Sequence, residues 1–527
     1  MLRVLITLFA VCSWHVQVFA FEVTGATIKG AITSLSNGEI SCVDLIQGHL
    51  DRIEAYDKAG PYLNSIISIA PLEALFEKAK SYDKIYHTTG KLYGSMHCIP
   101  IVAKDCYDHP QFPTTVASVV LKSCYPKYTS PVIANLEAEG AIIIAKTNLP
   151  DFTVGNSTFM SSISTLLGAT KNAYVEERSP YGSSGGTGAA IAASLGMIGL
   201  AADTQGSIQL PSAAEGMVGI RPTQGLVSAE NEFPLVMAQD SNGPISRTVA
   251  DAASILELIV NETVIRENDG NSDYTSYLDA DGLRGRRIGF SRDAFASFTV
   301  GDMEVEPDLE VVAAVETALG NMAAAGATVK DTNVSRPLSL YLNLNRKEVG
   351  DCGSSWNQYG ISRYLEHNYA DNCPIKNIQD IIDSGVYPAG DITRSWLDAM
   401  VNYTLPPDED PACTKYEEVT TTARELVLDI LARNEVDFVV YPVMNRLPTS
   451  ITPDSSDPVI NLITYISAST RLPSVTFPVG YAADGVPISM SITGRQYSEG
   501  ELIRIVYGFE QQVFNAMRRL PVDYPPL

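Results

Sequence analysis

The sequence predicts an α/β fold in which a mixed, mostly parallel central sheet is covered by helices on both faces. Three observations predict it. Short β-rich runs alternate with segments of helical period. The 527-residue chain is 45% hydrophobic, which is enough for a large core, and no internal repeat or low-complexity linker divides it. Because strands separated by helices favour parallel pairing, we expect a largely parallel sheet. Because no repeat or linker divides the chain, we expect one large domain over residues 21–527.

The predicted elements begin with a helical segment over residues 25–55, and residues 72–80 continue that pattern. Between residues 307 and 325, apolar side chains recur at helical spacing up to Gly326, which predicts a further helix. The β-rich runs that predict strands are residues 99–103, 141–145, 287–290, 438–441 and 474–477. Residues 336–415 are aromatic, rich in Asn and Asp and contain three cysteines. We interpret this stretch as a variable insertion beside the functional pocket.

The first twenty residues have the composition of a secretory signal peptide. Arg3 supplies a positive start, residues 4–12 are mostly apolar, and residues 18–20 form a small-x-small cleavage pattern. The alternative is a buried N-terminal helix. The apolar run is too short to span a bilayer. We therefore expect residues 1–20 to be removed and the mature protein to be secreted or to reside in the lumen of the secretory pathway.

Sequons for N-glycosylation fit the same route. They begin at Asn156, Asn261, Asn333 and Asn402. Chance alone supplies a few such patterns, so they accompany the leader and do not establish secretion. We expect a glycoprotein on the strength of the leader.

Seven cysteines remain after the leader, which allows up to three disulfides and leaves one thiol. Sequence does not determine their connectivity. Locality suggests one bridge within the group Cys98, Cys106 and Cys124, and another within the group Cys352, Cys373 and Cys413. The alternative is that most of the seven are buried free thiols, because cysteine packs as a small hydrophobe.

The net charge of −24 bears on the partners. Such a surplus repels phosphate backbones and anionic lipid surfaces. We therefore expect no nucleic-acid partner and no membrane association, and we interpret the surplus as favouring solubility. The sequence makes no prediction of oligomeric state.

A glycine-rich stretch at residues 182–188 precedes the small residues 189–193, an order typical of phosphate-binding loops. It lacks the Gly-Lys-Ser/Thr ending of a P-loop and the Gly-x-Gly-x-x-Gly of dinucleotide sites. The chain also has no paired-histidine zinc motif. We therefore expect no metal and no organic cofactor.

Three residues carry the strongest chemical signal. Ser183 and Ser207 each lie in a tight Gly/Ser setting, and Lys104 directly follows the predicted strand at residues 99–103. A hydroxyl is a poor nucleophile until a base takes its proton, and a neutral lysine acting through a second hydroxyl is such a base. The alternative, without a catalytic role, is that the lysine pairs with its neighbour Asp105 on the surface and that the serines are turn residues.

These segments strongly resemble the amidase signature family. The main match comprises residues 179–186, 202–212 and 219–223, and residues 100–105, 146–152, 243–251 and parts of 472–499 are also similar to it. The resemblance covers most of the mature chain and is weakest over residues 336–415. It implies a single amidase-signature domain and a hydrolase of amides.

The resemblance also implies a role for each matched catalytic position. Ser207 is the implied nucleophile, Ser183 follows a cis peptide bond after Gly182 and carries the proton, and Lys104 is the final base. Because a free lysine has a pKa near 10.4, Lys104 must be buried and largely neutral to act at neutral pH.

The same resemblance implies the residues that bind the substrate. The backbone N–H groups of Thr204, Gln205, Gly206 and Ser207 form the implied oxyanion hole. Thr153 is expected to line the acyl side of the pocket.

The chain departs from the family at several of these positions. Gln205 replaces a usual glycine, Gln209 a common arginine, and Tyr181 a glycine. Cys98 and Cys106 flank the lysine strand, so a disulfide there would brace Lys104. None of these changes removes a catalytic group, and we expect an unusual acyl pocket in an active enzyme.

The predicted function is hydrolysis of a carboxylic amide other than a peptide bond, through an acyl-enzyme on Ser207. The substrate is a small-molecule amide, with peptide amides, secondary-metabolite amides and esters left open. The alternative is a non-hydrolytic protein of this fold, with a binding, scaffold, acyl-transfer or cyclisation role. An exported, acidic chain argues against the tRNA-linked amidotransferase members.

Overall fold

The computed structural model describes residues 21–154, 162–268, 271–300, 303–350, 352–386, 391–403, 405–451 and 463–527. The expected leader and the sequon asparagine Asn156 lie outside these residues. No helix within the described ranges is both long and apolar enough to cross a bilayer.

An eleven-stranded sheet forms the centre of the molecule. From one edge to the other, its strands are β1 (Ile66–Ile69), β3 (Ile142–Thr147), β2 (Pro100–Lys104), β6 (Ile198–Asp203), β8 (Ser241–Ser246), β7 (Val218–Arg221), β14 (Ser474–Tyr481), β15 (Pro487–Thr493), β13 (Phe438–Pro442), β9 (Arg287–Ser291) and β12 (Thr328–Thr332). Two short ribbons lie outside it, β4 (Ile163–Ser164) with β5 (Gly168–Ala169), and β10 (Phe298–Val300) with β11 (Met303–Val305).

The sheet is mixed, as expected, but it is not mostly parallel. Parallel pairing is confined to β3–β2–β6 and β13–β9–β12, and the other neighbours in this sheet pair antiparallel. The five predicted strands are all present as β2, β3, β9, β13 and β14. The excess of antiparallel pairs involves β7, β8 and β15, which the sequence analysis did not predict as strands. Both β7 and β8 contain a glycine and lack the β-rich run that predicted the others.

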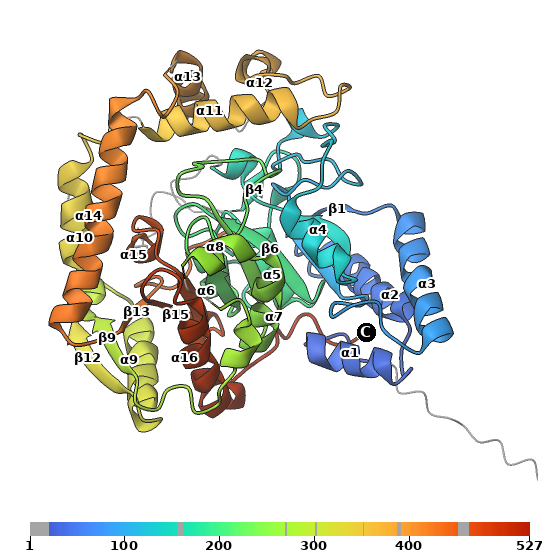
Figure 1. The fold of residues 1–527 in the computed structure, drawn as a ribbon, viewed down its shortest axis with the longest axis horizontal. Coiled ribbons are helices and arrows are strands. Elements are labelled where there is room, and N and C mark those ends of the chain that lie inside the picture. Colours follow the sequence, from blue (N-terminus) through green and yellow to red (C-terminus); the bar gives the residue numbers. More distant parts are fainter. Residues whose placement is uncertain are drawn as a thin grey trace, which may run out of the picture.

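Sixteen α-helices within the described ranges surround the sheet (Figure 1). They are α1 (Ile28–Ser36), α2 (Cys42–Arg52), α3 (Leu72–Thr89), α4 (Pro131–Ala138), α5 (Gly185–Ala192), α6 (Gln209–Ala214), α7 (Val249–Ile259), α8 (Glu262–Glu267), α9 (Leu309–Ala324), α10 (Ser335–Asn345), α11 (Cys352–His367), α12 (Ile378–Ser384), α13 (Asp391–Asn402), α14 (Pro411–Arg433), α15 (Tyr465–Ala468) and α16 (Glu499–Gln512). Every residue of β2, β3, β8, β13 and β15 is buried, so helices and loops cover both faces of these strands, as expected.

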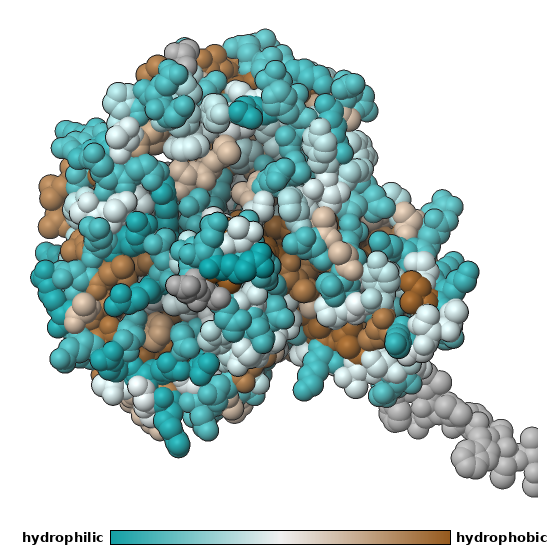
Figure 2. All heavy atoms as spheres, in the orientation of Figure 1, coloured by the Kyte–Doolittle hydropathy of each residue, from teal (hydrophilic) through white to brown (hydrophobic). Residues whose placement is uncertain are grey.

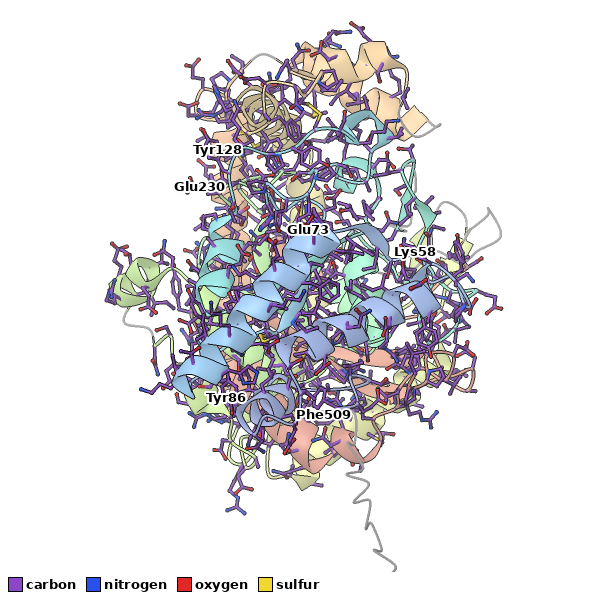
Figure 3. All side chains as sticks on the ribbon, turned by 90° about the vertical axis from the view of Figure 1, so that its right-hand side faces the viewer. Lys58, Glu73, Tyr86, Tyr128, Glu230 and Phe509 are labelled. Atoms are coloured by element: carbon purple, nitrogen blue, oxygen red, sulfur yellow. A yellow bond between two sulfur atoms is a disulfide. The ribbon has the colours of Figure 1, made fainter. Side chains whose placement is uncertain are left out.

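The predicted helical segments end where capping residues stop them. The segment over residues 25–55 divides into α1 and α2 because Ser41 starts the second helix, forming a capping box with Asp44. The segment at residues 72–80 continues as α3 to Gly90, which ends the helix with a left-handed φ of 66°. Figure 3 labels Glu73 and Tyr86 near the two ends of α3, which lies across that side of the molecule.

The expected insertion at residues 336–415 is helical. It contains most of α10, then α11, α12 and α13, and the start of α14. In Figure 1, α11, α12 and α13 lie along the top of the molecule, and α10 and α14 lie side by side at the left. Hydrophilic residues cover most of the face shown in Figure 2, in keeping with the acidic composition.

The cysteines form three disulfides and leave one thiol, which agrees with the count. The bridges are Cys42–Cys98, Cys124–Cys373 and Cys352–Cys413, and the free thiol is Cys106. The bridge expected within the second local group is confirmed. The bridge expected within the first group is wrong. Cys98 and Cys124 pair with cysteines 56 and 249 residues away, and Cys106 is the free thiol.

A bridge between Cys98 and Cys106, which would have braced Lys104, is therefore also wrong. The five-residue strand β2 lies between them. An extended strand of that length separates its ends by roughly 15 Å, far more than the reach of a disulfide.

Candidate active site

Lys104 is the last residue of β2, and its side chain points into the protein. The residue is 2% exposed. Its Nζ donates to Ser183 Oγ at 2.8 Å and to the carbonyl oxygen of Ala202 at 3.1 Å. The neighbouring Asp105 accepts from the buried Lys146 at 2.9 Å, so a surface pair with Lys104 is excluded. The expectation that Lys104 is buried is confirmed.

Ser183 lies just before α5 and follows the cis peptide bond between Gly182 and Ser183, as expected. Its side chain is 1% exposed and accepts the bond from Lys104. The preceding Tyr181 has a left-handed φ of 56°, and its carbonyl accepts from the buried Ser162. The segment before α5 is thus held by two hydrogen bonds, one from Lys104 to the Ser183 hydroxyl and one from Ser162 to the Tyr181 carbonyl.

Ser207 lies in the loop between β6 and α6 and is 3% exposed. Within the described residues, its Oγ makes no hydrogen bond, and so none to Ser183. The structure therefore brings Lys104 and Ser183 together and leaves the second contact of the expected relay open.

Asp203 organises the loop that carries Ser207. Its fully buried carboxylate accepts from the backbone N–H groups of Gly206 at 2.7 Å and Ile208 at 2.8 Å. It also accepts from Nε of the fully buried Arg221 at 3.1 Å. Both charged residues lie in segments that resemble the family, at residues 202–212 and 219–223, and the sequence analysis gave them no role. The signal for this buried pair was that Asp203 and Arg221 are the single charged residues of these two segments and have opposite charges.

The loop from Thr204 to Ser207 differs in one respect from the expected oxyanion hole. The N–H of Gly206 donates to Asp203 and is not free for a substrate oxygen. Within the described residues, the N–H groups of Thr204, Gln205 and Ser207 have no acceptor. Thr464 donates its hydroxyl to the carbonyl of Gln205 at 2.8 Å and so fixes that peptide.

A cavity of about 470 Å³ opens at Ser207. Its described lining is Thr153, Val154, Thr204, Gln205, Ser207, Leu235, Val236, Gln239, Val349, Gly350, Cys352, Gly353, Trp356, Asn357 and Tyr416. Thr153, Thr204 and Gln205 thus lie around the same cavity as Ser207. The lining residues 349–357 belong to the stretch 336–415, which the sequence analysis placed beside the functional pocket. It assigned none of these residues to the pocket individually, nor Tyr416 of α14, because nothing in the local sequence relates their side chains to the loop after β6.

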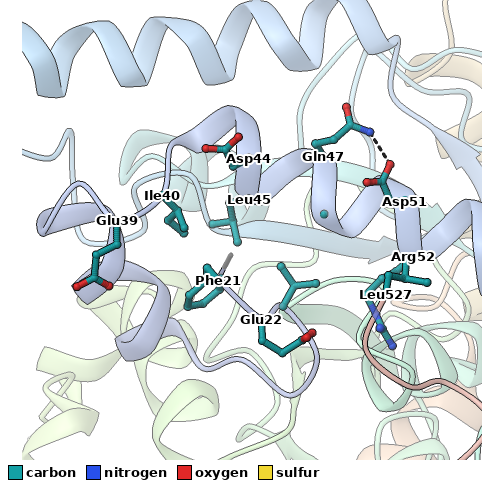
Figure 4. Close-up of a pocket in the computed structure, with 12 residues that line it drawn as sticks. Phe21, Glu22, Glu39, Ile40, Asp44, Leu45, Gln47, Asp51, Arg52 and Leu527 are labelled. Atoms are coloured by element: carbon teal, nitrogen blue, oxygen red, sulfur yellow. Dashed lines mark hydrogen bonds between the residues drawn. The ribbon is translucent and has the colours of Figure 1, made fainter. Parts of the chain in front are cut away.

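A second cavity, of about 430 Å³, is formed by other parts of the chain. Phe21, Leu45, Arg52 and Leu527 are among its lining residues (Figure 4). It contains none of the residues predicted to be catalytic, so we assign the site to the cavity at Ser207.

The group of metal-type ligands found within the described residues is Cys42, His97 and Cys98, whose ligand atoms lie within 4.8 Å of one another. The two cysteines form a disulfide with each other, so their sulfur atoms are not thiolates. The cluster therefore does not qualify as a metal centre in this oxidised form.

Two largely buried carboxyl groups, Glu232 and Asp240, lie near enough to Lys104 to interact with its charge. The thiol of Cys106 donates to Oε1 of Glu232 at 3.0 Å, and the amide of Asn242 donates to Oε2. Burial raises the pKa of Glu232 to about 7 and raises that of the Cys106 thiol well above its usual range. Burial also raises the pKa of Asp240, which accepts the Thr204 hydroxyl at 2.6 Å.

Comparison with known proteins identifies the class. The family model described as Amidase matches residues 44–503, and the chain belongs to that family. A glutamyl-tRNA(Gln) amidotransferase subunit from Gloeobacter violaceus is 30% identical over 506 residues, which cover 91% of this chain and 95% of the relative.

Solved structures agree with the family. The peptide amidase from Stenotrophomonas maltophilia superposes with a TM-score of 0.78 at 28% identity, covering 94% of this chain and 98% of the other. An amidase family protein from Bacillus anthracis gives 0.77 at 26% identity, covering 95% and 92%. The α/β fold of the family is therefore shown over nearly the whole chain.

Proposed function

We propose that this amidase hydrolyses a carboxylic amide with Ser207 as nucleophile, Ser183 as proton carrier and Lys104 as final base. The observation that supports it is the buried 2.8 Å bond between Lys104 Nζ and Ser183 Oγ, together with the position of Ser207 on the lining of a cavity. A buried amine that faces hydroxyl and carbonyl oxygens, with Asp105 bound elsewhere, is suited to take up a proton when the nucleophile attacks.

The proposed reaction has two halves. Ser207 Oγ attacks the carbonyl carbon, and its proton passes to Ser183, whose own proton passes to Lys104. The oxyanion accepts from the N–H groups of Thr204, Gln205 and Ser207, each free within the described residues. The carbon–nitrogen bond then breaks and the leaving nitrogen takes the proton back along the same route. Water, activated by the same relay, hydrolyses the ester on Ser207.

One contact of this relay has to form when the substrate binds, because Ser207 Oγ has no hydrogen bond in the described structure. Catalytic hydrogen bonds are often long or poorly aligned without substrate and tighten in the complex. The same open contact favours the alternative function, in which the fold binds a ligand and Ser207 is not an activated nucleophile.

A fluorophosphonate probe separates the two functions. We expect an adduct on Ser207 in the wild-type protein, located by mass spectrometry, and no adduct on that residue in Ser207→Ala. Lys104→Met should lower the labelling rate by at least about 10³, a typical loss when a nucleophile loses its base. The absence of an adduct on Ser207 in folded wild-type protein would instead favour the non-hydrolytic function.

Lys146→Met is the matched control for the lysine variant. Lys146 is equally buried, but it pairs with Asp105 and makes no contact with Ser183. Lys146→Met should therefore lower the free energy of unfolding and leave the labelling rate of the folded protein largely unchanged. Equal loss of labelling in both variants would contradict a special role for Lys104.

We also propose that residues 1–20 are a cleaved leader and that residues 21–527 form one secreted glycoprotein domain. Three disulfides support an oxidising compartment. The sequon residues Asn261, Asn333 and Asn402 are exposed. Mass spectrometry of the protein from a eukaryotic host tests this proposal, since a mature N-terminus at Phe21 and deglycosylation-sensitive masses are expected.

A further inference from the structure

A further cavity, of about 400 Å³, adjoins the cavity at Ser207, and we name it the adjoining chamber. The two cavities share the lining residues Gln205, Val349 and Tyr416, so they meet at these three residues. Gln205 is exposed and lies two residues before Ser207. The space at the nucleophile therefore continues past Gln205 into the adjoining chamber.

Two helices that lie side by side form much of the wall of the adjoining chamber (Figure 1). From α10 and its C-cap, Ser339, Leu342 and Arg346 line it, at spacings of three and four residues that place them on one face of the helix. From α14, Tyr416 and Thr420 line it in the same way. Arg346 is thus positioned at the chamber by the end of a regular helix.

Arg346 is the single charged residue in the described lining of the two cavities. It is exposed, and within the described residues its guanidinium makes no ion pair and no hydrogen bond. Two acidic residues on the neighbouring segments are bound elsewhere. Glu348 pairs with Lys415, and Glu417 pairs with Arg471. A chain with 61 acidic and 37 basic residues therefore leaves this guanidinium free at the chamber.

The chemistry of a free guanidinium selects its ligand. Its N–H groups form a planar fork that matches the two oxygens of a carboxylate. The described lining holds no acidic side chain that would compete for these donors or repel an incoming anion. The cavity at Ser207 holds no charge at all, so the adjoining chamber is the part of this space that favours a negative group.

We infer that Arg346 binds a carboxylate of the substrate, so that the reacting amide lies at Ser207 and the far end of the molecule carries its negative charge into the adjoining chamber. The inference rests on the proposed function and names the substrate class of that same site. The class is an amide that carries a carboxylate at the other end of a spacer.

Binding to Ser207→Ala tests the inference without requiring turnover. One series of probes is the ω-amidocarboxylates from succinamate to sebacamate, which carry the charge on the acyl side of the amide. The other is the N-acetyl-ω-amino acids of matching lengths, which carry it on the amine side. The neutral partner of each probe is its methyl ester.

Calorimetry at about 0.15 M salt should show a preference for the carboxylate in one of the two series. The longer carboxylates should bind about fivefold more tightly than their esters, the value of an ion pair at an accessible arginine. The shortest members should show no preference, because their charge stays beside the reacting amide, where the lining is neutral.

Arg346→Gln, added to Ser207→Ala, should bring the long carboxylate and its ester within twofold of each other, and Arg346→Lys should retain part of the preference. Arg336→Gln is the matched control, since it removes the same charge from an exposed arginine of α10 that lines neither cavity. Arg336 lies about 15 Å along the helix from Arg346, beyond the Debye length of about 8 Å, so it should keep the preference.

Three results would overturn the inference. They are the absence of a preference at every length in both series, a preference that survives Arg346→Gln, and an equal loss in Arg336→Gln. The proposed function fails on a different result. If wild-type protein shows no fluorophosphonate adduct on Ser207 and hydrolyses none of the probes, hydrolysis is wrong even where the carboxylate preference holds. If the adduct forms and the preference fails, only the role of Arg346 is wrong.

Discussion

Replacing Asp203 by Asn tests whether the buried Asp203–Arg221 pair positions the nucleophile. The carboxylate accepts from Gly206 and Arg221 on Oδ1 and from Ile208 and Gln209 on Oδ2. An asparagine keeps one acceptor oxygen and places an amino group against the other two donors. Whichever way the amide lies, two N–H groups lose their acceptor.

The expected cost follows from burial. Arg221 is fully buried, and its other hydrogen bonds are to the carbonyls of Gln239 and Leu472. Removing its carboxylate leaves an uncompensated charge, which costs about 3–5 kcal/mol of unfolding free energy. The loop after β6 would also lose the contacts that aim its free N–H groups. We expect the rate of fluorophosphonate labelling at Ser207 to fall by about 10²–10³, as for loss of an oxyanion donor.

Two measurements on the same sample separate stability from positioning. Urea unfolding gives the stability, and labelling well below the unfolding transition gives the rate for folded protein. Asp57→Asn is the matched control, because this buried carboxylate also accepts backbone N–H groups, from Ser65 and Ile66, and touches no site residue. It should lower stability and leave labelling intact. Wild-type labelling by folded Asp203→Asn would refute the reasoning.

Two further predictions follow from the site. Gly206→Ala places a Cβ 2.6 Å from Cγ2 of Thr464 at a φ of 119°, so we expect at least about tenfold slower labelling and a lower melting temperature, consistent with about 1–3 kcal/mol of strain. Gly485→Ala has a similar φ and open space around it, and should lower stability alone. Burial raises the pKa of Glu232 from 4.5 to about 7, so its contribution to stability is full below pH 4.5 and is lost as the pH rises through 7. Between pH 4.5 and 8, urea unfolding should show a loss of about 3 kcal/mol in wild type relative to Glu232→Gln; parallel pH profiles would contradict this.

The α/β class, the five β-rich strands and the positions of the main helices were predictable because each depends on local periodicity and capping. Thus Ser41 starts α2 through its side-chain cap, and Gly90 ends α3 through its left-handed backbone. Strands β7 and β8 were not predictable in this way, since their burial depends on neighbours elsewhere in the chain. The share of parallel pairing was overestimated for that reason.

The sequence by itself determined the family and the motif that contains Lys104, Ser183 and Ser207, because these features are encoded in contiguous residues. Only the tertiary structure decided that Lys104 bonds to Ser183 while Asp105 bonds to Lys146, and that Gly206 donates to Asp203. Tertiary structure also decided that Cys124 pairs across 249 residues, and that α11 and α14 close the cavity. Contacts between distant segments depend on how the whole chain packs, and local residue preferences carry no record of them.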